Sequence, residues 1–248
     1  MQIRKGRLTH ILARIAARER KTRGQAYVEL VLVLPVLIIM VLGLVEVVIF
    51  AGRYLDVLDL TRQAARFASV RDPFDALVAR DQDCSTPNQF DFFYDTACIF
   101  SPPAGSATCT DPAFCNGMNP YVTFDPARDD VVITIFTIAG NHVSDVWPAA
   151  GYWNLSGASE NWKRDCDGNL LNPAPDEPHF TESLVNSMLE AGSQPTKGFV
   201  AVEVYYCHEQ VLQLPLISDL LPNPMRIHAY TAMPLPAAQP TPTTTPGP

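Results

Sequence analysis

One uncharged apolar stretch near the N-terminus limits what this chain can fold into more than any other feature of its sequence. Between Glu29 and Glu46 stand 16 uncharged residues, nearly all of them Leu, Val or Ile. A helix needs roughly 20 residues to cross ~30 Å of hydrocarbon, and the stretch reaches that length when the two glutamates lie near the membrane interfaces. A core helix of a globular protein would carry polar residues at every turn, and this stretch carries none. The sequence therefore predicts a transmembrane helix over residues 25–52.

The charges of the chain are divided between its two parts. Residues 1–24 hold eight Lys and Arg and one Glu, whereas the other 224 residues hold 10 basic and 25 acidic side chains. The positive-inside rule predicts that residues 1–24 are a cytoplasmic leader and that the chain after the span lies outside. A cleaved secretory signal would end a shorter apolar region, of about 7–15 residues, with small residues, and this sequence does not. The acidic outer part repels phosphate backbones, so we expect no nucleic-acid partner.

The junction between the leader and the span has a distinctive order of residues. It reads Gly24-Gln25-Ala26-Tyr27-Val28-Glu29. This order resembles a type IV prepilin leader, and the stretch that continues to Pro35 resembles the TadE-like family, the minor pilins (pseudopilins) of tight-adherence pilus systems. Glu46 and Tyr54 also match the pattern of that family. The resemblance covers residues 24–70 well and the C-terminal strands loosely, and it says nothing of residues 71–198.

The resemblance implies how the N-terminal part works. A prepilin peptidase would cut between Gly24 and Gln25, which makes Glu29 the fifth residue of the mature chain. The new α-amino group, on the same chain or a neighbouring one, would neutralise Glu29, and this contact would set the register between packed helices. Position alone also allows an interfacial glutamate that the helix dipole favours at a helix start. Pro35, which can kink the span, and Glu46, at the outer interface or facing another subunit, would belong to the same packing surface.

The resemblance also implies a function that is not enzymatic. A TadE-like minor pilin takes part in assembling or tipping a pilus used for surface attachment, by packing its helix in the membrane or the filament. Its partners would be other pilins and pseudopilins, the prepilin peptidase, the assembly platform and membrane lipid. Two alternatives stay open. One is an uncleaved single-pass anchor that displays a sugar- or protein-binding domain, and the other is a membrane-tethered hydrolase with an unrecognised site.

The rest of the sequence predicts an α+β fold. Residues 53–71 have apolar side chains on one helical face, so the transmembrane helix should continue into an amphipathic helix. Three segments have the β-branched or alternating pattern of strands: Val131–Ile138, Phe199–Cys207 and Arg226–Ala232. A helix and a small sheet, each apolar on one face, bury those faces against one another. The outer half of the helix should therefore pack on this sheet.

The outer domain is expected to span residues 72–233 and to hold long loop-rich insertions at 72–120 and 140–198. An apolar connection punctuated by prolines joins the last two predicted strands through residues 212–224. Residues 234–248 consist largely of Pro, Thr and Ala, and this composition predicts a disordered tail.

Six cysteines are present, and all of them follow the predicted span: Cys84, Cys98, Cys109, Cys115, Cys166 and Cys207. An even number outside the membrane favours disulfides, whose connectivity a sequence does not fix. Proximity favours Cys84–Cys98 and Cys109–Cys115, which leaves Cys166 for Cys207. Zinc is the alternative, but the spacing of zinc ligands is missing.

Signals for metals and catalysis are weak, and we expect no cofactor. Asp165, Asp167 and Asn169 have the spacing that begins a calcium loop, but the glycine, Gly168, comes too early for the sixth position of such a loop, and Asp-Gly-Asn is also ordinary turn chemistry. Enzyme motifs are missing from the sequence. Cys207 and His208 are neighbours on a predicted strand and therefore point to opposite faces, which prevents a simple nucleophile–base pair.

Overall fold

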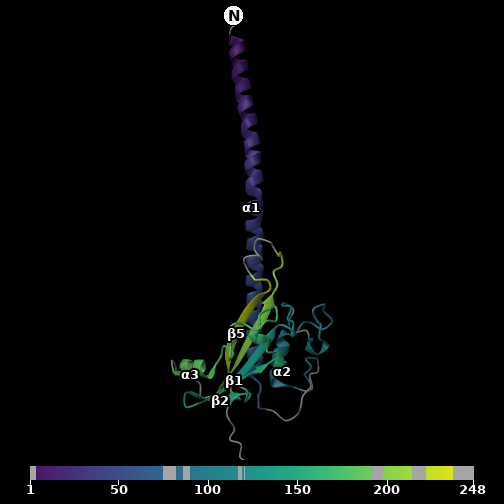
Figure 1. Cartoon of the computed structure of the whole chain (residues 1–248), viewed down its shortest axis with the longest axis vertical. Helices are drawn as coiled ribbons and strands as arrows, with labels where there is room; N and C mark the ends of the chain where they lie inside the picture. Colours follow the sequence, from purple (N-terminus) through teal and green to yellow (C-terminus); the bar gives the residue numbers. More distant parts are fainter. Residues whose placement is uncertain are drawn as a thin grey trace, which may run out of the picture.

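A long helix, α1 (Arg4–Ser69), projects from an α+β domain in the computed structural model of the chain (Figure 1). The structure describes residues 4–74, 82–85, 90–116, 119, 121–190, 198–213 and 222–236, and of residues 4–23 and Glu190 it describes the backbone alone. α1 runs through Pro35 without a break. α1 ends at Ser69, two residues before the predicted end at residue 71. Pro73 follows shortly after, and the residue before a proline disfavours the helical conformation.

A five-stranded antiparallel sheet forms the centre of the outer domain. Its strands are β1 (Asp130–Ala139), β2 (His142–Trp147), β3 (Trp153–Asn154), β4 (Gly198–His208) and β5 (Met225–Leu235). The order is β2-β1-β4-β5, and β3 pairs with β1. The three strands predicted from the sequence correspond to β1, β4 and β5, so the α+β prediction is confirmed. β2 and β3 lie inside the predicted 140–198 insertion and were not expected, because β2 is largely exposed and lacks the apolar alternation of a buried strand.

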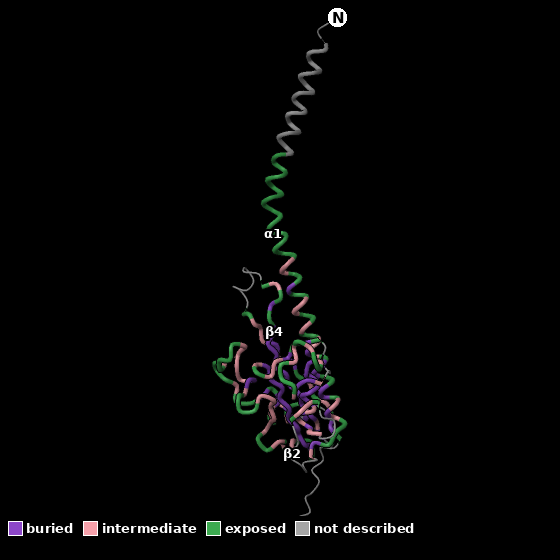
Figure 2. Tube along the Cα trace, turned by 90° about the vertical axis from the view of Figure 1, so that its right-hand side faces the viewer, coloured by how far each residue is buried: buried purple, intermediate pink, exposed green. Residues whose placement is uncertain are grey.

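The outer half of α1 covers one face of this sheet, and the main core lies between them (Figure 2). Three small side chains, Ala64, Ala65 and Ala68, are fully buried and let the helix approach the sheet closely. The facing residues alternate along the two central strands, and they are Val131, Ile133 and Ile135 of β1 and Val200, Val202 and Val204 of β4. The predicted amphipathic face of the helix is therefore the one that packs.

The opposite face of the sheet is covered by elements of the predicted insertion. α3 (Glu182–Glu190) packs on Phe136, Ile138 and Ala201, and the fully buried Trp162 packs against Val132. This second layer explains why β1 is apolar on both faces. A short helix, α2 (Phe92–Ala97), lies on the α1 side, with two of its aromatic side chains in the core.

Two predicted segments differ from the structure or fall outside it. The predicted tail begins at residue 234, but Pro234 and Leu235 complete β5, and Leu235 is fully buried. Residues 237–248, and residues 214–221 of the apolar connection between β4 and β5, lie outside the described residues.

Candidate functional site

The N-terminal half of the described part of α1 exposes a continuous apolar surface. The segment Gly24–Ser69 is long and apolar enough to cross a membrane, and only 6 % of its most apolar window is buried. Every residue from 24 to 41 is exposed, and Figure 2 shows this part of the helix standing clear of the domain. A soluble protein would cover so large an apolar surface. The outer domain therefore leaves this part of the helix uncovered.

Gly24 and Glu29 both lie on this exposed surface. Gly24 is within the helix, and a Cβ added there would meet no atom within 4 Å. Glycine costs about 1 kcal/mol relative to alanine inside a helix, and neither packing nor a turn requires it here. The fold therefore does not explain why residue 24 is a glycine. Pro35 lies on the same exposed stretch, inside the continuous helix.

Glu46 has partners within its own chain. It is 7 % exposed, and its carboxylate accepts hydrogen bonds from the backbone N–H groups of Val211 (2.7 Å) and Leu212 (2.9 Å). These two residues begin the connection between β4 and β5. The sequence places Glu46 at the outer interface or against another subunit and gives no sign of this internal contact. In the structure, Glu46 ties the connection to α1.

Arg53, about two helical turns after Glu46, fastens the helix to the domain. Its guanidinium donates a hydrogen bond to the backbone carbonyl of Tyr121 and lies 3.7 Å from the carboxylate of Asp56. His208 is buried beside Phe50, with 5.7 Å between the ring centroids. Burial lowers the pKa of His208, although the negative charge of Glu46 opposes this shift. The ring is therefore neutral near pH 7.

On the face of the sheet that is turned away from α1, one buried carboxylate accepts hydrogen bonds from groups that lie far apart in the sequence. Glu203 on β4 is 1 % exposed. It accepts hydrogen bonds from the backbone N–H groups of His179 and Phe180, the hydroxyl of Tyr205 and Nε2 of His228, at 2.8 to 3.2 Å. Burial would raise the pKa of Glu203, but these hydrogen bonds together lower it. With every donor already used, the cluster acts as a structural junction between β4, β5 and residues 179–180.

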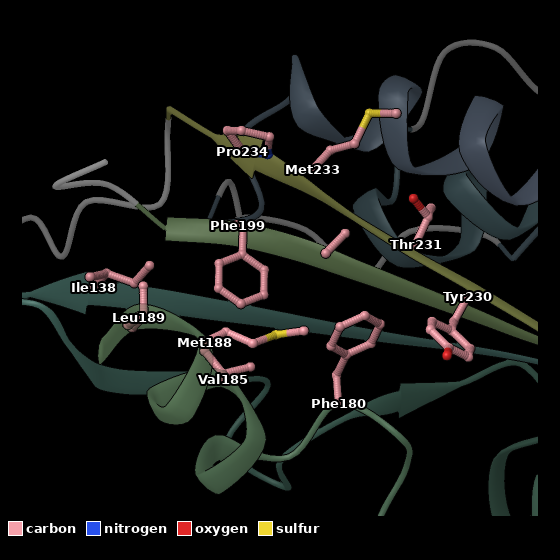
Figure 3. Close-up of a pocket in the computed structure, with 11 residues that line it drawn as sticks. Ile138, Phe180, Val185, Met188, Leu189, Phe199, Tyr230, Thr231, Met233 and Pro234 are labelled. Carbon is pink, nitrogen blue, oxygen red and sulfur yellow. The ribbon is translucent and has the colours of Figure 1, made fainter. Parts of the chain in front are cut away.

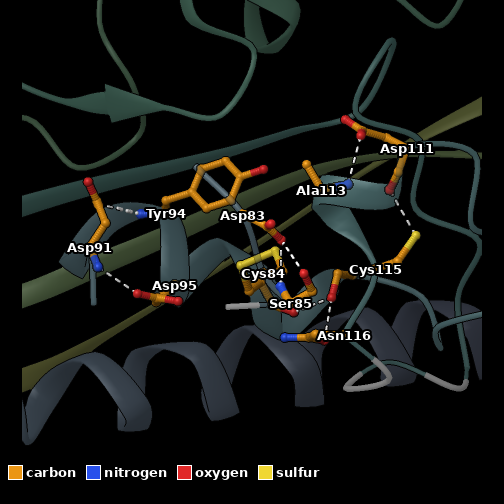
Figure 4. Close-up of a disulfide and its surroundings, with 12 residues drawn as sticks. Asp83, Cys84, Ser85, Asp91, Tyr94, Asp95, Asp111, Ala113, Cys115 and Asn116 are labelled. Carbon is orange, nitrogen blue, oxygen red and sulfur yellow. Dashed lines mark hydrogen bonds between the residues drawn. A yellow bond between two sulfur atoms is a disulfide. The ribbon is translucent and has the colours of Figure 1, made fainter. Parts of the chain in front are cut away.

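Three disulfides cross-link the outer domain, and they are the two pairs that proximity in the sequence favours and the pair that remains. They join Cys84 to Cys98, Cys109 to Cys115 and Cys166 to Cys207. Figure 4 shows the first of these regions, where the backbone N–H of Cys84 also donates to the carbonyl of Ala113 at 2.7 Å. Burial and three nearby aspartates raise the pKa of Tyr94, in the same region, to about 12. No cysteine in the structure is free.

The candidate calcium ligands form a hydrogen-bonded turn. Asp165 accepts hydrogen bonds from the backbone N–H groups of Asp167 (3.0 Å) and Asn169 (2.8 Å) and from the side chain of Asn169. These bonds lower the pKa of the Asp165 carboxyl, the bond from Asn169 most of all. The geometry is that of the turn alternative. Among the described residues, no group of three or more His, Cys, Asp or Glu could hold a metal ion.

An apolar groove of about 460 Å³ lies between α3 and the edge strand β5. Figure 3 shows Met188 and Phe180 on one side of it and Tyr230 on the other. Its lining holds no acid, base or nucleophile suited to catalysis. The groove can accept an apolar group.

Comparisons with known proteins agree with the features of the long helix. No curated protein and no solved structure matches the chain. A family model described as TadE-like protein matches residues 24–66, which begin at the helical Gly24 and end within the packed half of α1. The matched segment thus contains Glu29, Pro35 and Glu46, and the chain carries a TadE-like family domain at residues 24–66.

Proposed function

We propose that this protein is a TadE-like minor pilin that takes part in assembling a tight-adherence pilus used for surface attachment. The TadE-like domain implies a protein related to the Tad pilus, and the proposal adds the role. The protein acts by packing α1 against the helices of other pilins and pseudopilins, in the membrane or in the filament. Its other partners are the prepilin peptidase, the assembly platform and membrane lipid.

The observation that carries this proposal is the exposed apolar surface of α1 from residue 24 to residue 41. Lipid tails cover such a surface in the membrane, and helices of neighbouring subunits can replace them, because packing between helices works without a hydrophobic driving force. Glu29 is the single charged side chain on this stretch. An ionised carboxylate is costly in hydrocarbon and needs a partner. The α-amino group freed by cleavage before Gln25 supplies that partner and sets the helix register.

The proposed layout follows from the same surface. Residues 1–24 are a basic cytoplasmic leader, residues 25–52 cross the membrane, and residues 53–71 form the packed helix of an outer domain that extends to residue 233. Three disulfides support the extracytoplasmic placement, because the cytosol keeps thiols reduced.

Leader removal is the first test. The N-terminal residue of the membrane-extracted protein should be Gln25, and Gly24→Ala should leave the leader in place. Gly52→Ala is the matched control, since Gly52 also lies in α1 and a Cβ there meets no atom within 4 Å. An intact Met1 in the wild-type protein would contradict the proposal and favour an uncleaved membrane anchor.

The second test addresses helix packing. Glu29→Ala and Glu29→Gln both remove the charge, so pilus assembly should be lost while the amount of protein stays the same. Asp59→Ala removes an exposed acid further along the same helix and should leave assembly intact. Normal pili with Glu29→Ala would show that the carboxylate is only an interfacial charge.

A further inference from the structure

The outer domain first touches α1 well inside the apolar stretch. Residues 24–41 are exposed, Leu42 and Gly43 are half-buried, and Glu46 is the first buried residue. The contact is made by residues at the end of β4 and the start of β5, including His208, Gln210 and Met225. The domain therefore reaches along the helix into a segment whose composition suits a membrane.

The length of the exposed segment places this contact relative to a bilayer. About 20 helical residues cross the hydrocarbon. Counted from Gly24, directly after the last basic residue of the leader, such a span ends at Gly43. Counted from Val28, it ends at Val47. Glu46 lies between these two ends. The hydrocarbon boundary therefore falls where the domain meets the helix.

The β4–β5 connection begins at this same level. The two hydrogen bonds from Val211 and Leu212 hold its backbone against the Glu46 carboxylate. Val211 is nevertheless 61 % exposed. An exposed valine held at the hydrocarbon boundary gains free energy when lipid covers it.

A cavity of about 220 Å³ lies beside this connection, between α1 and the end of the sheet. Gly43, Val47, Phe50 and Met225 contribute to its walls, and its accessible surface is almost wholly apolar. Val47 is itself exposed to the outside of the helix. The cavity is thus an apolar niche at the level of the hydrocarbon boundary.

We propose that Val211 forms a second membrane contact, in which its side chain enters the outer interface of the bilayer and a lipid acyl chain fills the niche. This inference rests on the proposed function, because it requires α1 to cross the membrane. The outer domain then sits on the bilayer surface and is fixed in orientation by two points, α1 and the β4–β5 connection. The part of the chain after residue 24 is strongly acidic, so the contact works by apolar insertion and needs no anionic lipid.

The test uses the full chain in phosphatidylcholine vesicles at a high ratio of lipid to protein. All described cysteines are disulfide-bonded, so a cysteine introduced by Val211→Cys is labelled selectively with an environment-sensitive fluorophore. Nitroxide quenchers are attached to the lipid near the headgroup or near the end of the acyl chain. Two matched variants are Leu37→Cys, in the middle of the span, and Leu170→Cys, a 59 % exposed residue on the outer domain.

We expect the shallow quencher to reduce emission at position 211 about twofold or more, because interfacial side chains lie ~5–10 Å deep. The deep quencher should act best at position 37, and neither should act at position 170. Adding anionic lipid or salt should leave the result at position 211 unchanged.

Each other outcome has one meaning. A label at position 37 that escapes both quenchers would overturn the proposed membrane span. Normal quenching at position 37 with position 211 behaving like position 170 would overturn this inference alone. Shielding at position 211 that appears only when the protein is crowded would identify a second copy as the occupant and also overturn it. Because Val211 is exposed, its replacement should leave the fold intact, which the tryptophan fluorescence of the domain verifies.

Discussion

The carboxylate of Glu46 accepts a hydrogen bond of 2.7 Å from the backbone N–H of Val211, 165 residues further along the chain. A second bond, from the N–H of Leu212, goes to the other carboxylate oxygen. Together these bonds satisfy two backbone N–H groups that lie beyond the end of β4 and have no strand partner. They also join the helix to the β4–β5 connection. One acidic residue in an apolar stretch thus fixes how the outer domain meets α1.

Removing this carboxylate should free the connection. Hydrogen bonds to a charged acceptor contribute about 1.5–3 kcal/mol, so Glu46→Ala should speed amide exchange at Val211 and Leu212 about tenfold or more. Glu46→Gln keeps one acceptor oxygen and should give an intermediate rate. Hydrogen exchange of peptides covering residues 209–213 measures the effect. Asp59→Ala, which removes an exposed acid of α1, should leave these amides unchanged, and unchanged exchange with Glu46→Ala would refute the tie.

Glu203 should contribute far more to stability than Glu209, an exposed glutamate just after the end of the same strand. Glu203→Ala leaves buried donors unpaired, and each unsatisfied buried donor costs about 1–3 kcal/mol. Glu209 pairs with Arg128 at 2.8 Å but is largely exposed, and such pairs are worth about 0–1 kcal/mol. Thermal unfolding of the two alanine variants in detergent, followed by tryptophan fluorescence, should separate them clearly. Equal losses of stability would mean that the buried junction is not held by its carboxylate.

The stability of the outer domain should fall as the pH rises towards 7. Asp129 is fully buried, and burial raises the pKa of its carboxyl to about 7, although N–H groups of Asp125 and Cys207 favour its charged form. Its unfolded pKa is near 3.8, so the folded state holds an extra proton between these values. That stabilisation is complete below the unfolded pKa and is lost as the pH rises through the folded pKa.

Denaturant unfolding between pH 5 and pH 8 measures this slope. Asp129→Asn cannot ionise and should flatten the profile. Asp130 is also buried, with a pKa that burial raises, and should retain part of the slope. Asp59→Asn, at an exposed position, should behave as the wild type. A wild-type profile that rises with pH over this range would contradict the assignment.

The disulfides should differ in what they contribute. The chain-entropy model assigns about 4 kcal/mol to Cys166–Cys207, which closes 41 residues, and about 2 kcal/mol to Cys109–Cys115, which closes six. Replacing each pair by alanines should therefore lower the unfolding midpoint in urea more for the first pair. The reverse order would show that strain or residual structure outweighs loop closure.

Local patterns in the sequence determined the long elements of this protein. The apolar run after Glu29 and the helical face beyond it predicted α1 from residue 25 onward. A β-branched run that is apolar on both faces predicted β1, and period-two alternation predicted β4 and β5. Close spacing named two cysteine pairs, and the last pair followed by elimination. For the helix and the strands, the signal lies within one segment, because burial imposes a period or an unbroken apolar run on the residues of that segment.

Tertiary structure alone decided the polar contacts and the second layer of the sheet. Glu46 meets Val211 and Leu212, and Glu203 meets His179 and His228, across separations at which no sequence period operates. β2 and α3 escaped prediction because β2 is short and mostly exposed and because α3 lies within a segment rich in turn residues. The sequence by itself determined that a helix leaves the domain with an uncovered apolar surface. The position at which the domain meets that helix depends on two hydrogen bonds to the Glu46 carboxylate. Only folding brings their donors close to it.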